Sequence, residues 1–139
     1  MVRCTSGSGN CTSLTAGDKS DFNSVWGSDP TNVYVVGSSG AKVLRCNAGT
    51  AFCMQMNSDT SQSLNAVWGS DAANVYAVGY SGTVIRCRSG STNCQTISSG
   101  TTQTLLGVWG SDASNVYVVG KNGTVVRCSA GVPTCTVLS

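Results

Sequence analysis

One stretch of the sequence occurs three times. It reads VWGSDPTNVYVVG at residues 25–37, VWGSDAANVYAVG at residues 67–79 and VWGSDASNVYVVG at residues 108–120. The tryptophans of the three copies, Trp26, Trp68 and Trp109, are 42 and 41 residues apart. A repeat with such a regular period indicates that the chain is built from similar structural units that pack on their neighbours.

The apolar segments within each unit are too short for helices. In the last unit they read LLGVWG, NVYVVG, TVVRC and CTVLS, and each is bounded by Gly, Ser, Asn or Asp. They are rich in β-branched residues and lack helical spacing. The link Asn122-Gly123 can adopt the positive φ of a tight hairpin. Each unit is therefore predicted to be a four-stranded antiparallel sheet.

Four short strands with a longer connection to the next unit are typical of a β-propeller blade. We predict one all-β propeller domain over residues 1–139, with a half-blade at 1–21 and blades at 22–63, 64–104 and 105–139. Propellers usually close with about four to eight blades, so three and a half blades would leave apolar faces at both ends. We expect self-association into a homodimer or small ring. The alternative is that these residues are a piece of a longer propeller.

The repeat pattern L-x-x-V-W-G-S-D-x-x-N-V-Y-V-V-G-x-x-G-T-V-x-R-C resembles the blades of bacterial propellers related to the Asp-box and photosystem-assembly-factor group. It is most similar to the VWGSSxxDVWAVGxxGTIL repeats of secreted myxobacterial proteins. The resemblance covers nearly the whole chain and implies a propeller fold. It implies little about function, because many such proteins have no assigned activity. The Asp-box turn, S-x-D-x-G-x-T-W, is absent, and a cysteine pair occupies its place.

Eight cysteines form four pairs, and six residues separate the two members of each pair. The spacers hold Gly and small polar residues, which favour turns, and opposite residues of a hairpin lie within disulfide reach. Each bridge would contribute roughly 2.5 kcal/mol through chain entropy. A zinc site is disfavoured by this spacing and by the absence of His. The predicted disulfides are Cys4–Cys11, Cys46–Cys53, Cys87–Cys94 and Cys128–Cys135. They indicate a secreted, extracellular or periplasmic protein.

Composition argues against several classes of function. The net charge is only +2 and the eight basic residues are spread along the chain, so no nucleic-acid surface is expected. No apolar run approaches the roughly 18 residues that span a bilayer, so no membrane insertion is expected. The chain has neither His nor Glu. With its cysteines paired, we predict no catalytic residue, no metal and no cofactor.

Repeated polar and aromatic residues are the candidates for ligand binding. The aspartates after Trp-Gly-Ser are expected to form Asx turns, and their repetition argues against a glycosidase pair. The tryptophans could stack on sugars or pack between blades, and the tyrosines Tyr34, Tyr76 and Tyr117 are expected in the core. The arginines before the cysteines, Arg3, Arg45, Arg86 and Arg127, are expected to pair with an aspartate or lie on an outer face. The candidates are Asp29, Asp71, Asp112, Asn32, Asn74, Asn115, Trp26, Trp68, Trp109 and Tyr80, the last in an exposed turn.

These features predict a multivalent, non-enzymatic binding module. Carbohydrate binding is the favoured interpretation, because equivalent shallow sites gain strength by avidity. The alternative is a structural or protein-interaction scaffold, such as a surface or filament component, since head-to-tail contacts that do not close produce filaments. Glycans and further copies of the chain are the predicted partners.

Overall fold

The computed structural model describes residues 1–4, 11–13, 19–50 and 52–139. The first described strands, β1 (Val2–Cys4) and β2 (Cys11–Ser13), form a two-stranded antiparallel ribbon. The ribbon lies within the predicted half-blade at 1–21, of which residues 5–10 and 14–18 lie outside the described residues.

Across the rest of the described chain, three four-stranded antiparallel sheets follow, each with its strands in chain order. The first sheet consists of β3 (Phe22–Asp29), β4 (Asn32–Gly37), β5 (Val43–Cys46) and β6 (Cys53–Met56). The second sheet consists of β7 (Leu64–Asp71), β8 (Asn74–Gly79), β9 (Val84–Cys87) and β10 (Gln95–Ile97). The third sheet consists of β11 (Leu105–Asp112), β12 (Asn115–Gly120), β13 (Val125–Cys128) and β14 (Thr136–Val137). The prediction of an all-β fold with four-stranded antiparallel units is confirmed.

Single-turn 3-10 helices connect the second and third strands of two sheets. They are η1 (Tyr80–Gly82) and η2 (Lys121–Gly123). Asn122 has a φ of 54° and Gly123 a φ of 71°, so both residues take the positive φ predicted from the Asn-Gly pair. The turn brings β13 back alongside β12 and starts the cysteine-containing hairpin.

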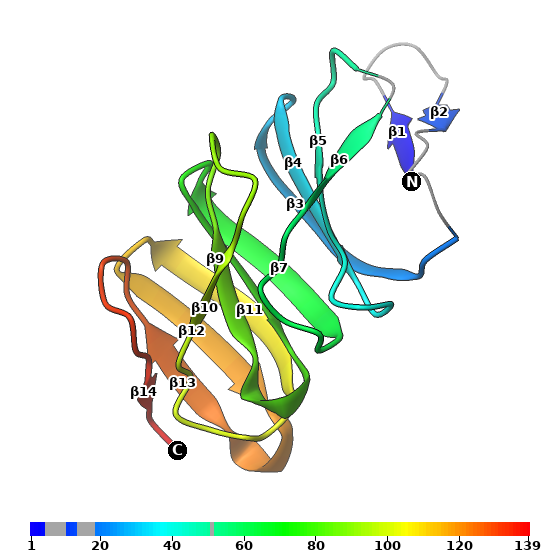
Figure 1. Ribbon diagram of the computed structural model, residues 1–139. Coiled ribbons are helices and arrows are strands. Elements are labelled where there is room, and N and C mark those ends of the chain that lie inside the picture. Colours follow the sequence, from blue (N-terminus) through cyan, green and yellow to red (C-terminus); the bar gives the residue numbers. More distant parts are fainter. Residues whose placement is uncertain (5–10, 14–18, 51) are drawn as a thin grey trace.

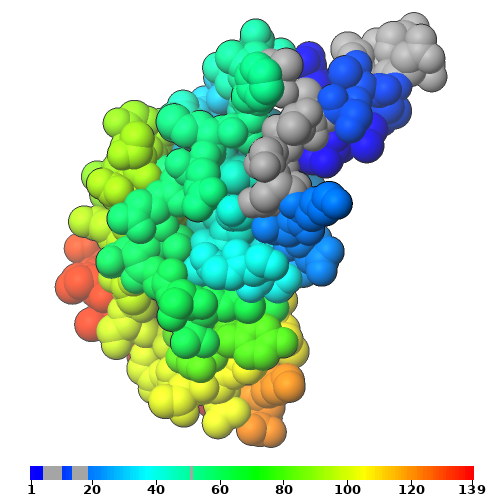
Figure 2. Space-filling view, turned by 45° about the vertical axis from the view of Figure 1, so that its right-hand side comes forward, coloured from blue at the N-terminus to red at the C-terminus, as the bar shows by residue number. Residues whose placement is uncertain are grey.

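The sheets stack face to face in chain order, and their first strands, β3, β7 and β11, lie side by side (Figure 1). The β1–β2 ribbon lies at one end of the stack and the third sheet at the other (Figures 1 and 2). We call the face of a sheet that is turned toward the next sheet its front face. The face turned toward the preceding sheet is its back face. Because side chains alternate along a strand, each sheet supplies one set of residues to each face.

Apolar side chains fill both spaces between sheets. Between the first and second sheets, the front-face residues Tyr34 and Val36 pack against the back-face residues Leu64 and Val75. The same positions meet between the second and third sheets, where Tyr76 and Val78 pack against Leu105 and Val116. Fully burying one such side chain contributes about 1.5–3 kcal/mol. The two spaces between sheets are therefore the core of the molecule.

All four predicted disulfides are present. Each joins the two arms of a hairpin, with Cα–Cα distances of 4.1 to 4.3 Å. Cys46 and Cys53 are directly opposed in the register of β5 and β6. The bridges close the outer hairpin of every unit, including the ribbon, and they fit an oxidising, extracellular environment.

Candidate functional site

Each repeated aspartate closes the link between the first and second strands of its sheet. In the second sheet, Oδ1 of Asp71 accepts the backbone N–H of Ala73 at 2.8 Å, and Oδ2 accepts the hydroxyl of Ser70 at 2.8 Å. The same two bonds form at Asp29 and at Asp112. The predicted Asx turns are therefore confirmed, and they allow a reversal of only two residues between the strands.

The repeated asparagines bridge the aspartates to the arginines. Nδ2 of Asn74 donates to both carboxylate oxygens of Asp71, each at 3.0 Å, and Oδ1 of Asn74 accepts a hydrogen bond from Arg86. The sequence predicted that the arginines pair with an aspartate or lie on an outer face, whereas the direct partner is the asparagine that bonds to the aspartate. We call this hydrogen-bonded set of aspartate, asparagine and arginine a relay. It recurs in the other sheets as Asp29–Asn32–Arg45 and Asp112–Asn115–Arg127.

These hydrogen bonds lower the pKa of all three carboxyl groups below the ordinary value. The largest cause is the amide of Asn74 at Asp71, the amide of Asn115 at Asp112, and the side chain of Thr31 at Asp29. A carboxyl with a lowered pKa is a poor proton donor at neutral pH. The relays therefore present ionised carboxylates whose oxygens already serve as acceptors for their own turns.

Trp26 and Trp68 lie between sheets, where each covers a glycine of the next sheet. A Cβ placed on Gly69 would lie 2.6 Å from Cη2 of Trp26, and a Cβ on Gly110 would lie 2.6 Å from Cη2 of Trp68. The six-membered ring thus occupies space that only a glycine leaves open. This contact gives a structural reason for the repeated Trp-Gly pair, and it favours the packing interpretation of both tryptophans.

Tyr34 and Tyr76 lie beside these tryptophans, as predicted for core residues. Both are fully buried, and within the described chain their hydroxyls have no hydrogen-bond partner. Burial raises the pKa of both phenols. The expectation fails for Tyr117, which is 39% exposed because it lies on the front face of the third sheet.

The candidate residues do not form one site. Asp71 and Asn74 lie together at one end of β8, and the corresponding pairs do so in the other sheets. Tyr80 is 49% exposed and follows the opposite end of β8. Tyr80 is six positions along the chain from Asn74, which corresponds to roughly 20 Å of extended strand. Ligand contact by these residues stays a prediction.

Two contacts between sheets were missed in the sequence. Nδ2 of Asn23 donates to the carbonyl of Leu64 at 2.7 Å, and Nδ2 of Asn65 donates to the carbonyl of Leu105 at 2.8 Å. The third repeat has Leu106 at this position, and its side chain is 51% exposed. The change from Asn to Leu is visible in the sequence. Whether an asparagine at this position forms a hydrogen bond depends on which sheet packs in front of it.

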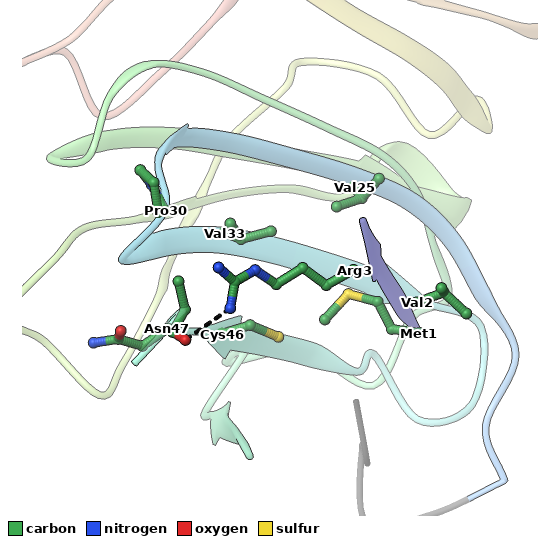
Figure 3. A pocket seen from close by; sticks show the side chains of 9 residues that line it. Met1, Val2, Arg3, Val25, Pro30, Val33, Cys46 and Asn47 are labelled. Atoms are coloured by element: carbon green, nitrogen blue, oxygen red, sulfur yellow. Dashed lines mark hydrogen bonds between the residues drawn. The ribbon is translucent and has the colours of Figure 1, made fainter. Parts of the chain in front are cut away.

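The two end faces of the stack carry exposed apolar residues. On the front face of the third sheet, Trp109 is 63% exposed. The back face of the first sheet has a cavity of about 210 Å³, lined by Val25, Val33 and Cys46 and partly covered by Met1 and Arg3 of the N-terminal segment (Figure 3). These faces are the second candidate for a binding site.

No protein-family model matches the chain, and no curated protein is significantly similar to it in sequence. Within the described residues, no helix combines the length and apolar character needed to cross a membrane. In that same part of the chain, no three His, Cys, Asp or Glu side chains are grouped as metal ligands. The functional interpretation therefore rests on the geometry of the relays and of the end faces.

Proposed function

We propose that the protein is a non-enzymatic protein-interaction module, an arc of β-propeller blades that acts as a scaffold in an extracellular assembly. The observation that carries this proposal is the contrast between equivalent apolar residues. Tyr34 and Tyr76 are fully buried between sheets, whereas Tyr117 is 39% exposed at the end of the stack. An end face of this kind is an interaction surface, because monomeric proteins rarely leave such apolar patches uncovered.

The arrangement of the sheets supports the propeller part of the proposal. Four-stranded antiparallel sheets stack face to face with their first strands adjacent, which is the way blades are arranged around a propeller axis. The disulfides close the outer hairpins, so each blade is reinforced at its rim. Such reinforcement suits a protein that works outside the cell.

Static light scattering at increasing protein concentration tests the scaffold function. We expect the mass to rise above that of the 14.2 kDa monomer, because the apolar ends leave water on association. A monomeric mass at every concentration, together with failure to bind any extracellular protein offered to it, would contradict the proposal. Light scattering of the reduced protein serves as a control, because loss of the disulfides that close the outer hairpins should change the association.

Carbohydrate binding remains a second candidate function, favoured by one observation. The three relays present an exposed carboxylate at the same edge of each sheet, with the asparagine amide beside it. Identical groups at regular intervals suit a repetitive polysaccharide, which gains strength through avidity. A glycan array probed with oxidised protein tests this candidate. Binding that survives the combined change of Asp29, Asp71 and Asp112 to Ala in a folded protein would exclude the relays as the site.

A further inference from the structure

Each space between sheets is organised around one tryptophan and one receiving surface. Trp26 packs against the core that contains Val67, Val75 and Cys87 of the second sheet, and it covers Gly69. The corresponding contact in the third sheet involves Trp68 with Val108, Val116, Cys128 and Gly110. We call this set of one glycine, two valines and one cysteine on a back face the tryptophan socket.

The first sheet has the same socket at the same positions. It consists of Gly27, Val25, Val33 and Cys46, and three of these residues line the cavity of about 210 Å³ (Figure 3). The socket is open: Val25 is 60% exposed, whereas its equivalent Val67 is 7% exposed. A Cβ added to Gly27 would approach only atoms of its own sheet, at 3.1 Å or more. The socket of the first sheet is therefore accessible from solvent, and Met1, Val2 and Arg3 cover it in part.

The matching tryptophan lies at the opposite end of the stack. Trp109 faces Tyr117 across β11 and β12, as Trp68 faces Tyr76 in the second sheet. Its side chain is 63% exposed. The described structure thus contains an open socket on the first sheet and an exposed tryptophan on the third sheet. The chain joins the same two groups internally at both of its sheet-to-sheet contacts.

We propose that Trp109 of one copy occupies the socket around Gly27 of a second copy, so that copies associate head to tail. This inference rests on the proposed scaffold function and names its partner. The contact between copies brings together the same tryptophan and glycine positions as the contact between sheets, and its two surfaces are different. The β1–β2 ribbon lies on the socket side of the first sheet, so Met1 and Arg3 of the N-terminal segment have to move aside for the incoming sheet (Figure 1). Such a heterologous contact leaves one surface free at each end, so association continues until a ring closes or a filament forms.

The third sheet has an apolar side chain where the first and second sheets have an asparagine, and this difference suits a contact with the first sheet of a second copy. Leu106 replaces the asparagine that donates to the carbonyl of Leu64 or Leu105 at the internal contacts. In the contact between copies, Leu106 would face the region of Phe22. A second cavity of about 230 Å³ lies there, lined in part by Met1, Phe22 and Val25. An aliphatic side chain fits this apolar cavity better than an amide does.

Arg3 lies across the socket and adds a cationic group to it (Figure 3). Its side chain extends along the cavity, and Nη1 donates to the carbonyl of Ala48 at 2.8 Å (Figure 3). A guanidinium held beside an indole attracts the face of the aromatic ring. Arg3 therefore contributes to the binding of an aromatic side chain in preference to an aliphatic one.

Two single variants separate the two halves of the contact. Trp109→Ala removes the inserted side chain but leaves the socket intact. Gly27→Ala places a Cβ where the indole would lie, at the position equivalent to Gly69 and Gly110, but leaves Trp109 intact. Both positions are exposed in a single copy, so each variant is expected to unfold at nearly the wild-type temperature. Tyr80→Ala is the matched control, because it removes an exposed aromatic side chain away from both faces.

The decisive experiment is light scattering on the variants alone and mixed in equal amounts. We expect each variant alone to stay monomeric, the mixture to form a one-to-one dimer, and Tyr80→Ala to associate like the wild type. Association of Gly27→Ala alone would mean that two third-sheet faces bind each other, which overturns the inference. A mixture that remains monomeric would overturn it as well. If both variants associate like the wild type, only the inference fails. If the wild type is monomeric and binds no protein, the scaffold function fails.

Discussion

Trp68 and Trp109 occupy the same position in the second and third sheets, yet their surroundings differ. Trp68 is partly buried against Gly110 of the next sheet, whereas Trp109 is 63% exposed. The residues around them are nearly the same, so the difference comes from the sheet in front. In a repeat protein, each unit is stabilised by its neighbours, and an end unit has one neighbour fewer. One repeated residue can therefore be a core residue in one unit and a binding residue in another.

Truncating the two tryptophans gives the largest expected contrast. Trp68→Ala removes a large side chain from between two sheets and should lower the free energy of unfolding by about 3 kcal/mol. Trp109→Ala should change it by less than about 0.5 kcal/mol when the protein is monomeric. Chemical denaturation of the oxidised proteins at low concentration measures both values. Equal losses would mean that Trp109 is packed in the single chain.

Adding one methyl group to equivalent glycines gives the next largest contrast. Gly69→Ala forces a Cβ to within 2.6 Å of Trp26, and overpacking of this kind costs about 1–3 kcal/mol. Gly27→Ala meets only its own sheet, the Val33 side chain at 3.1 Å and the Asn32 carbonyl at 3.2 Å, so its effect should be under about 0.5 kcal/mol. Thermal unfolding of the two variants compares them directly. Similar losses would show that the two glycines are needed for a reason other than the indole.

The asparagine of the internal contact should have a smaller effect. Asn65→Leu removes the hydrogen bond to the carbonyl of Leu105 and should cost about 1 kcal/mol. The reverse change in the third sheet, Leu106→Asn, should leave the stability of the monomer unchanged and weaken association. Chemical denaturation measures the stability of the two variants, and light scattering measures their association. A stability loss from Leu106→Asn would contradict the placement of Leu106 on an open face.

The Asp–Asn–Arg relays should be insensitive to position in the stack, because each forms within its own sheet. The pKa of each aspartate is lowered in the folded protein, so the unfolded chain binds more protons near and below the ordinary pKa. The stabilisation is therefore present above about pH 4 and is lost as the pH falls further. Melting temperatures between neutral and acidic pH should show a smaller decrease for Asp71→Asn than for the wild type. Asp112→Asn should behave in the same way, and a response confined to one sheet would contradict this expectation.

Local features of the fold could be predicted from the sequence. The strands follow from short β-branched segments, the disulfides from the constant spacing of pairs such as Cys46 and Cys53, and the Asx turns from the aspartate after Trp-Gly-Ser. Each depends on residues close together in the chain. The strands, disulfides and Asx turns are determined within one sheet, so they can be predicted without knowing how neighbouring units pack.

Contacts between units could not be predicted in the same way. The donation from Asn23 to Leu64 and the cover of Gly69 by Trp26 depend on how far one sheet is displaced against the next. The hydrogen bond between Arg86 and Asn74 links neighbouring strands at a diagonal, whereas the sequence suggested an aspartate partner or an outer face. The exposed state of Trp109 depends on which sheet lies in front, and the sequence of its own repeat does not contain that information.

Fluorine NMR of the protein labelled with 5-fluorotryptophan tests the head-to-tail contact most directly. Substitution of Trp109 by Phe assigns its resonance, and the solvent isotope shift between H₂O and D₂O measures the exposure of each indole. As the protein concentration rises, we expect the isotope shift of Trp109 to fall toward the values of Trp26 and Trp68, which should stay constant. A mass that rises while Trp109 keeps its full isotope shift would show that association does not bury this side chain, and would contradict the contact.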